Sequence, residues 1–344
     1  MERKRYLDLL RGLAAIAVVF IHVAGNNWYG FWGSTSWLAF TTYIGVCKLA
    51  VPIFFMISGC LFLDDTKNKP IKKLYSSTIK RLVIFLLFWA SIYKILQLPA
   101  EGTFAQKIWN VLLEVINGNT QNHLWYIYGI IGLYILSPML KIFANNATKS
   151  QLLYAIAVCF VFGSLSELFS HIPEISFLAV NINKIKCGVS VGYIGFFLLG
   201  YYLDKYEIEK KHRLLLYTCG VVGITTSIGM VMFDCITNQS GIERYWSYSM
   251  PGMVIASAAV FVLFKYKKKK IVVADAILEN VAKYSLGIYG CHFIFIMFIW
   301  ATGFTTLSFH GIISVPVISM IVLMCSYVTS WVVQKIPLVG KYLA

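Results

Sequence analysis

Charged residues are scarce in this sequence. Only 13% of the 344 residues are Asp, Glu, Lys or Arg, and the 15 acidic residues are half as many as the 30 basic ones. Hydrophobic residues make up 58% of the chain, which is well above the share found in soluble globular proteins. The polar stretches between the apolar runs are too short for a second hydrophobic core. This composition excludes an ordinary soluble enzyme and indicates an integral membrane protein.

The sequence also lacks the motifs of several familiar enzyme classes. It has no GxGxxG after a predicted strand, no phosphate loop ending in GK[ST], no HExxH and no GxSxG. Its eight cysteines are scattered singly, without the spacing of a metal site or a disulfide framework. We therefore expect no metal. The excess of basic residues needs no nucleic-acid partner, because anionic lipid headgroups and an anionic cytosolic ligand account for it.

Ten apolar runs are long enough to cross a membrane as helices. They lie at residues 7–27, 42–63, 79–97, 123–143, 151–170, 187–203, 213–233, 250–265, 285–303 and 312–333. A membrane β-barrel would show alternating hydrophobicity instead. The sequence predicts an all-α integral membrane protein, with residues 1–344 forming a single polytopic bundle of about ten transmembrane helices.

The positions of the basic residues predict how this bundle is oriented. Most of them fall in alternate loops, as the positive-inside rule requires when both termini are cytosolic. This orientation places Lys67–Arg81 and Lys265–Lys283 in the cytosol, and Phe104–Asn122 and Asp234–Ser249 on the outer side.

Two segments outside the spans have the pattern of amphipathic helices. Apolar residues recur at helical spacing from Phe104 to Val115 and again from Ile271 to Val281. We expect the first helix to lie on the outer membrane surface and the second on the cytosolic surface. Both can be passive anchors, and the first can also roof an outward-facing cavity.

The first span carries three ionisable residues, Asp8, Arg11 and His22. Arg11 and His22 are eleven residues apart, which in a helix is about 20° past three full turns and a rise of roughly 16 Å. Their side chains therefore share one face, with Asp8 one turn from Arg11. Such groups at membrane depth usually face a bundle interior or a wet cavity, so a functional site is favoured. The structural alternative is an interfacial Asp8–Arg11 pair and a histidine bonded to a neighbouring helix.

Several segments together resemble the membrane-bound acyltransferase type 3 family, typified by bacterial O-acetyltransferases of surface polysaccharides. LDLLRGLAAIAVVFIHV resembles the family's Arg-x10-His signature in the first helix. The resemblance continues through KLAVPIFFMISGCLF, TIKRLVIFLLFW, HLWYIYGIIGLYILSPML, YIGFFLLGYYL, YSLGIYGCHFIFI and the closing KIPLVGKYL. It covers essentially the whole chain.

This resemblance implies a multi-pass enzyme of the bacterial cytoplasmic membrane. Members of the family take an acyl group, commonly acetyl, from cytosolic acyl-CoA and deliver it to a hydroxyl of a glycan or a lipid-linked sugar. His22 matches the essential histidine of the family and Arg11 its paired arginine. Lys48 stands where the family often has an arginine, and the basic pair Lys80 and Arg81 lacks the proline that commonly follows it.

The chemistry of the residues fits this implication. Transfer from a thioester to an alcohol needs a base with a pKa near 7, which histidine supplies, so His22 can act as a general base or carry the acyl group transiently. We place Asp8 with His22 in the catalytic group. The phosphates of acetyl-CoA need fixed cations, and Arg11, Lys80 and Arg81 are expected at the cytosolic ends of their spans.

Four further residues are candidates for substrate binding: Lys48, His123, Tyr134 and His292. Each has a structural alternative. Lys48 can extend to the lipid headgroups, and an aromatic belt explains Trp125 and Tyr126 beside His123. Tyr134 can simply pack in the bundle, and His292 can be a buried histidine with a satisfied hydrogen bond.

A transporter or flippase of glycan precursors or small metabolites is the main alternative function. Ten helices and buried charges are compatible with transport. The sequence shows no obvious half-to-half repeat, and matching proline-interrupted spans are not evident. We therefore expect an acyl-CoA-dependent acyltransferase whose partners are acyl-CoA, a glycan or lipid-linked acceptor, and membrane lipids.

Overall fold

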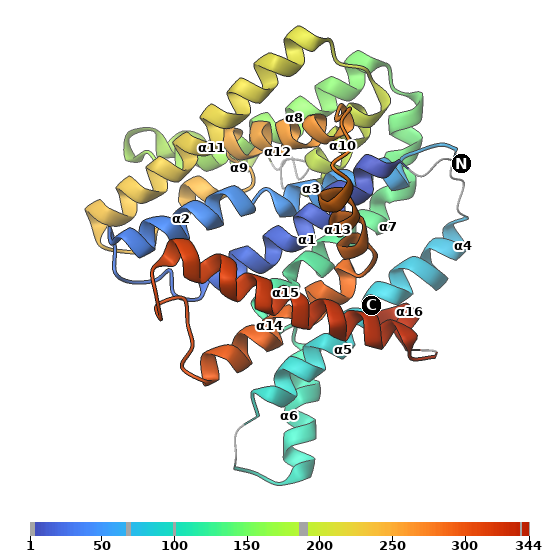
Figure 1. Ribbon diagram of the computed structural model, residues 1–344. Coiled ribbons are helices and arrows are strands. Elements are labelled where there is room, and N and C mark those ends of the chain that lie inside the picture. Colours follow the sequence, from blue (N-terminus) through green and yellow to red (C-terminus); the bar gives the residue numbers. More distant parts are fainter. Residues whose placement is uncertain (1–3, 67–69, 99–100, 186–191, 338, 344) are drawn as a thin grey trace.

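The computed structural model describes residues 4–66, 70–98, 101–185, 192–337 and 339–343 (Figure 1). All regular elements in these ranges are helices, which confirms the all-α prediction. The first half contains α1 (Arg5–Gly25), α2 (Thr35–Cys47), α3 (Ala50–Phe62), α4 (Ile71–Lys73), the π-helix η1 (Leu74–Ile79), α5 (Lys80–Leu96), α6 (Phe104–Ile116), the short 3-10 helix η2 (Asn122–Leu124), α7 (Trp125–Asn146) and α8 (Lys149–Ser170). The second half contains η3 (Pro173–Ile175), α9 (Ser176–Lys184), α10 (Tyr193–Lys205), α11 (Lys210–Asn238), η5 (Arg244–Trp246), α12 (Pro251–Lys265), α13 (Val272–Lys283), α14 (Ser285–Ala301), α15 (Gly311–Lys335) and α16 (Gly340–Leu343).

Most of the expected spans are long and apolar helices. Within the described ranges, seven are long and apolar enough to cross a membrane, and the sharply bent pair α13 and α14 makes up to eight. The two remaining expected spans correspond to α5, with 17 residues, and α10, with 13. Residues 187–191 of the span expected at 187–203, and residues 67–69 of the loop expected in the cytosol, lie outside the described ranges. The structure confirms a polytopic helical membrane protein, and the count of ten stays a prediction.

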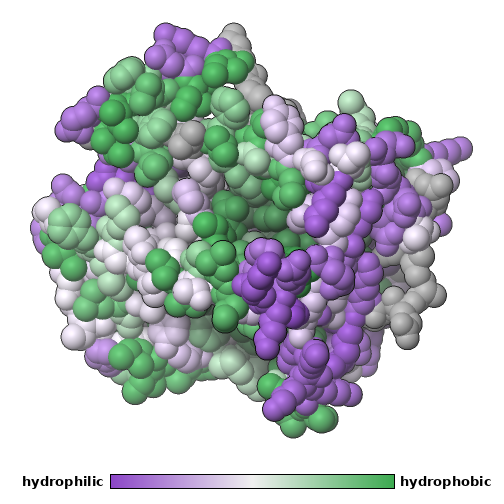
Figure 2. All heavy atoms as spheres, turned by 90° about the horizontal axis from the view of Figure 1, so that it is seen from above, coloured by the Kyte–Doolittle hydropathy of each residue, from purple (hydrophilic) through white to green (hydrophobic). Residues whose placement is uncertain are grey.

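Helix α1 lies at the centre of the bundle. It packs against α2, α3, α12, α13, α14 and α15. In Figure 1 the N-terminal end of α1 and the C-terminal end of α15 lie at the same end of the bundle. Figure 2 shows hydrophilic side chains gathered over that end, whereas apolar side chains cover more of the remaining surface. This distribution agrees with a bundle that has one strongly polar face, and the assignment of that face to the cytosol stays a prediction.

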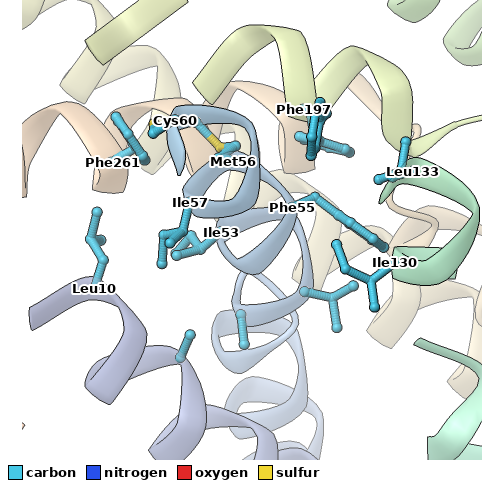
Figure 3. Close-up of a cluster of buried hydrophobic side chains, with 14 of the residues drawn as sticks. Leu10, Ile53, Phe55, Met56, Ile57, Cys60, Ile130, Leu133, Phe197 and Phe261 are labelled. Carbon is cyan, nitrogen blue, oxygen red and sulfur yellow. The ribbon is translucent and has the colours of Figure 1, made fainter. Parts of the chain in front are cut away.

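The main hydrophobic core surrounds α3. Figure 3 shows Phe55, Met56 and Ile57 of α3 pointing toward side chains of four neighbouring helices. Those neighbours include Leu10 of α1, Ile130 and Leu133 of α7, Phe197 of α10 and Phe261 of α12, all of them buried. This packing holds α1 and α7 in fixed positions relative to each other.

Small residues allow helices to approach closely at two places. A Cβ atom on Gly59 of α3 would lie 1.8 Å from the carbonyl oxygen of Phe197, and one on Gly200 of α10 would lie 2.1 Å from that of Met56. A Cβ atom on Gly12 of α1 would lie 2.1 Å from the Leu278 carbonyl oxygen of α13. Backbones therefore touch directly at both contacts, as small residues permit in membrane bundles.

Both helices that were expected outside the spans are present. The first is α6, which begins with a capping box formed by Thr103 and Gln106. The second is α13, which packs along α1. Each is short and carries a strong apolar stripe, as an interfacial helix does.

We predict that Gly59→Ala lowers the thermal stability of the protein in detergent. The added methyl group meets backbone rather than a movable side chain, so α3 and α10 must separate, at an expected cost of about 1–3 kcal/mol. Gly132→Ala in α7 is the matched control, because a Cβ atom there meets nothing within 4 Å. Equal melting temperatures for the two variants would contradict the proposed contact.

Candidate functional site

Three histidines from three distant parts of the chain meet inside the bundle. His22 comes from α1, His123 from η2 at the start of α7, and His292 from α14. Their ring centroids lie 5.7 Å apart for His22 and His123, 5.1 Å for His22 and His292, and 4.9 Å for His123 and His292. His123 and His292 are buried, and His22 is partly buried. We call these three residues the histidine cluster.

The hydrogen bonds of His292 define the state of its ring. Its Nδ1 atom lies 2.8 Å from the carbonyl oxygen of Tyr289 and 3.2 Å from that of Ile288. Because a carbonyl oxygen can only accept, Nδ1 carries the proton, and the neutral ring has its lone pair on Nε2. The Nε2 atom is buried and has no hydrogen-bond partner in the described part of the chain. It can accept a hydrogen bond from a substrate group.

His123 is also held in place by its surroundings. Its backbone carbonyl oxygen accepts a hydrogen bond from the Tyr289 hydroxyl, and its ring lies 5.1 Å from the Tyr93 ring and 5.5 Å from that of Phe293. Both ring nitrogens are buried without a partner among the described residues. A buried polar group without a partner costs about 1–3 kcal/mol, so a cluster of such atoms is typical of a place where a ligand supplies the partners.

The cluster does not have the arrangement of a metal centre. Zinc-binding imidazole nitrogens lie about 2.0–2.1 Å from one common point. In the described ranges no group of three or more His, Cys, Asp or Glu side chains is placed to hold a metal ion.

A cavity with a volume of ≈ 490 Å³ lies beside the cluster, between α1, α3, η1, α5, α7 and the bend from α13 to α14. Three basic side chains line it: Arg11, Arg81 and Lys283. Tyr126 and Tyr289 line it as well, and the Tyr289 ring lies 5.5 Å from the His123 ring. The three histidines do not line the cavity themselves, and Tyr289 lies between this basic cavity and the histidine cluster.

Two of the residues predicted for an anionic ligand, Arg11 and Arg81, face this cavity, whereas Lys80 is exposed and does not line it. Tyr134, predicted as a substrate contact, also lines the cavity, with its hydroxyl 3.3 Å from Ser58 Oγ and its ring stacked on Phe62. Lys283 is a cavity residue that the sequence did not single out for this site. The signal that could have identified Lys283 is its position in a basic segment, directly before the break between α13 and α14.

The two remaining predicted residues lie away from the histidines. Asp8 is an ion-pair partner of Arg11 at 3.9 Å, and it precedes His22 by fourteen residues, or roughly 21 Å of helix rise. Lys48 pairs with Glu243 at 3.0 Å and lies 5.1 Å from the Trp246 ring centroid. The structure thus joins Asp8 to the cavity through Arg11, and it joins Lys48 to a separate polar cluster near η5.

A network of ion pairs holds α13 against the start of α1. Asp275, whose side chain is buried, pairs with Lys267 and with Arg5, and the Arg5–Asp275 distance is 3.1 Å. Arg5 also contacts Glu279 at 2.5 Å. The hydrogen bond from Lys267 lowers the pKa of Asp275. Because Ala282 and Lys283 at the end of α13 line the cavity, this network positions one cavity wall.

A family model described as "Acyltransferase domain" matches residues 4–333. The matched region includes the histidine cluster, the cavity and the helices α6 and α13. Searches of curated proteins and of solved structures gave no match.

We predict that protonation of Asp275 loosens α13. Because its folded-state pKa is lowered, its ion pairs contribute stability above the unfolded-state pKa, and this contribution is lost as the pH falls through the folded-state pKa. Hydrogen-exchange protection factors of α13 should fall on acidification, and Asp275→Asn should show reduced protection already at pH 7. Asp65→Asn, in an exposed turn, is the control. An α13 with unchanged protection in Asp275→Asn would show that the network does not hold this helix.

Proposed function

This chain belongs to the acyltransferase family whose model it matches, and from this premise we propose that it transfers an acyl group, commonly acetyl, from cytosolic acyl-CoA to a hydroxyl of a cell-surface glycan or lipid-linked sugar. It is a multi-pass membrane acyltransferase. The proposed location is the bacterial cytoplasmic membrane.

One observation carries the proposal. A cavity lined by three basic side chains shares the wall residue Tyr289 with the surroundings of three histidines, two of which have buried ring nitrogens without partners in the described residues. An acyl thioester of a phosphorylated carrier needs both features, because its phosphates require cations and its reacting carbonyl requires a base and hydrogen-bond donors.

In this proposal the phosphates of the donor lie near Arg11, Arg81 and Lys283, which line the cavity. From Arg11, the helix rise to His22 is roughly 16 Å, which the pantetheine arm of the donor would span. Tyr126, Tyr134 and Tyr289 form part of the wall between the two ends, together with apolar side chains of α3 and α7. The uncharged arm and the acyl group would therefore pass through a less polar part of the cavity than the phosphates.

His22 is the proposed base. It takes the proton of the acceptor hydroxyl while the hydroxyl oxygen attacks the thioester carbonyl carbon. When the tetrahedral intermediate collapses, the carbon–sulfur bond breaks, and the proton passes from His22 to the departing thiolate. In the alternative course, an imidazole nitrogen of His22 attacks the thioester carbonyl, the carbon–sulfur bond breaks, and the imidazole proton leaves with the thiolate as CoA thiol. The acceptor hydroxyl then attacks the acyl-imidazole, the carbon–nitrogen bond breaks, and the hydroxyl proton returns to His22.

The other two histidines have complementary roles in this proposal. His292 Nε2 can accept a hydrogen bond from the acceptor hydroxyl or from His22, because its proton is fixed on Nδ1. A neutral His123 carries one N–H group, which can donate to the developing oxyanion. Asp8 acts in this scheme through Arg11, its ion-pair partner.

We predict that loss of the His22 side chain removes the base of the reaction. His22→Ala should lower acyl transfer from radiolabelled acetyl-CoA by about 10²–10⁴-fold, which is the usual loss when a positioned base is removed. His212→Ala, an exposed histidine at the start of α11, is the matched control and should retain full activity. Both variants should remain monodisperse in detergent. Near-normal transfer by His22→Ala would rule out the proposed mechanism.

We predict that the adjacent basic residues Arg81 and Lys80 differ in their contribution to CoA binding. Arg81→Ala should weaken CoA binding about tenfold to a hundredfold in calorimetry, because a hydrogen bond to a charged group contributes about 1.5–3 kcal/mol. Lys80→Ala should change the affinity by less than about twofold, because Lys80 is exposed outside the cavity. If both substitutions weaken binding equally, the phosphates do not lie in this cavity.

A further inference from the structure

A second polar groove lies between α5 and α6, and none of its lining residues lines the basic cavity. It has a volume of ≈ 500 Å³, and its polar lining consists of Lys94, Gln97, Asn110, Glu114 and Asn117. Figure 1 shows α5 and α6 as a hairpin that projects from the bundle. The groove is thus open to the surroundings of the protein and belongs to no part of the proposed donor site.

The groove has the chemistry of a site for a neutral ligand rich in hydroxyl groups. Its two charges compensate each other, because Lys94 pairs with Glu114 at 3.0 Å, and the hydrogen bond from Lys94 lowers the pKa of Glu114. Asn110 and Asn117 are exposed, so their side-chain amides are accessible to a ligand from the groove. An amide offers both donors and acceptors, which is what a sugar hydroxyl requires, and the balanced charge disfavours an anion.

The opposite face of α6 is apolar and exposed. Phe104, Ile108, Leu112 and Ile116 recur at every fourth residue and are 81%, 42%, 48% and 77% exposed. Asn110, Glu114 and Asn117 project roughly on the other side of the helix. A helix with this division lies in the membrane interface, with its apolar stripe in the acyl chains and its polar face toward the headgroups. With α6 in this position, the groove would be at headgroup level, beside lipid.

Two contacts join the groove to the histidine cluster. Tyr93, the residue before Lys94, lies with its ring centroid 5.1 Å from that of His123. Gln97, one helical turn further along α5, donates a hydrogen bond to Gln121, two residues before His123. The groove and the histidine cluster are therefore neighbours that are separated by the buried side chain of Tyr93.

We propose that this groove binds the sugar headgroup of an amphiphilic acceptor, whose apolar chain lies along the Phe104–Ile116 face of α6. This inference rests on the proposed function and selects a lipid-anchored sugar over a free polysaccharide. The sugar enters from the membrane interface, and its hydroxyl reaches the histidine cluster past Tyr93.

Photo-crosslinking tests the groove without any acyl transfer. Dodecyl glycosides of glucose, galactose and N-acetylglucosamine, each carrying a photoreactive group on the chain, are added to the full chain in lipid nanodiscs. At least one of them should label α5 or α6 saturably in wild type. The double substitution Asn110→Ala and Asn117→Ala should raise its half-saturation concentration about tenfold. Asn238→Ala, an exposed asparagine at the end of α11, is the control and should leave it unchanged.

A competition experiment tests the amphiphilic character. The dodecyl glycoside should displace the probe at least tenfold more effectively than the methyl glycoside, and Ile108→Ser with Leu112→Ser should reduce this difference. Equal competition by both glycosides would favour a soluble saccharide and overturn the proposal, as would labelling that is absent, unsaturable or outside α5 and α6. Because none of these measurements uses acetyl-CoA, their failure is distinguishable from a failure of the transfer reaction itself.

Discussion

The continuous helix α1 sets the distance between the basic cavity and the histidine cluster. A membrane-spanning helix must satisfy its backbone hydrogen bonds internally, so α1 runs unbroken from Arg5 to Gly25. Its geometry fixes Arg11 and His22 on one face, roughly 16 Å apart. Because α1 packs against six other helices, these neighbours fix the distance between Arg11 and His22. The cavity and the histidine cluster are thus placed by a single rigid element, and the surrounding helices supply the remaining groups.

The cost of buried polar groups explains why the site is concentrated at so few positions. His123 and His292 contribute ring nitrogens that lack partners in the described structure, and each such atom opposes folding. The close contacts at Gly59 and Gly200, and the large buried core around α3, stabilise the bundle elsewhere. The site is consequently a locally unfavourable arrangement that is maintained by the packing of the surrounding bundle.

The sequence predicted the parts of the site that depend on local periodicity. The shared face of Arg11 and His22 follows from helical geometry, and the fold class follows from the apolar runs. It could not predict that His22, His123 and His292 meet, because that contact depends on how α1, α7 and α14 pack. The sequence also could not predict that Arg81 lines the cavity whereas Lys80 does not. The π-helix η1 ends directly before them and shifts the angular phase of α5, so a regular period of 3.6 residues does not tell which of the two faces the cavity.

The positions of the basic side chains and the histidines also distinguish a transferase from a transporter of similar architecture. In the proposed reaction the polyanionic carrier stays at Arg11, Arg81 and Lys283, and only an uncharged acyl group advances to the histidines. Burying an isolated ionised group in a nonpolar medium costs on the order of tens of kcal/mol by solvation alone, whereas an acetyl group carries no charge to desolvate. The acyl group can therefore be passed to an acceptor that approaches from the α5–α6 side while the donor remains in place. Transport of the intact carrier would instead require the basic cavity to open alternately to both faces, and it would leave the histidine cluster without a role. The separation of charge-binding and reacting groups along α1 thus favours group transfer between two fixed substrates.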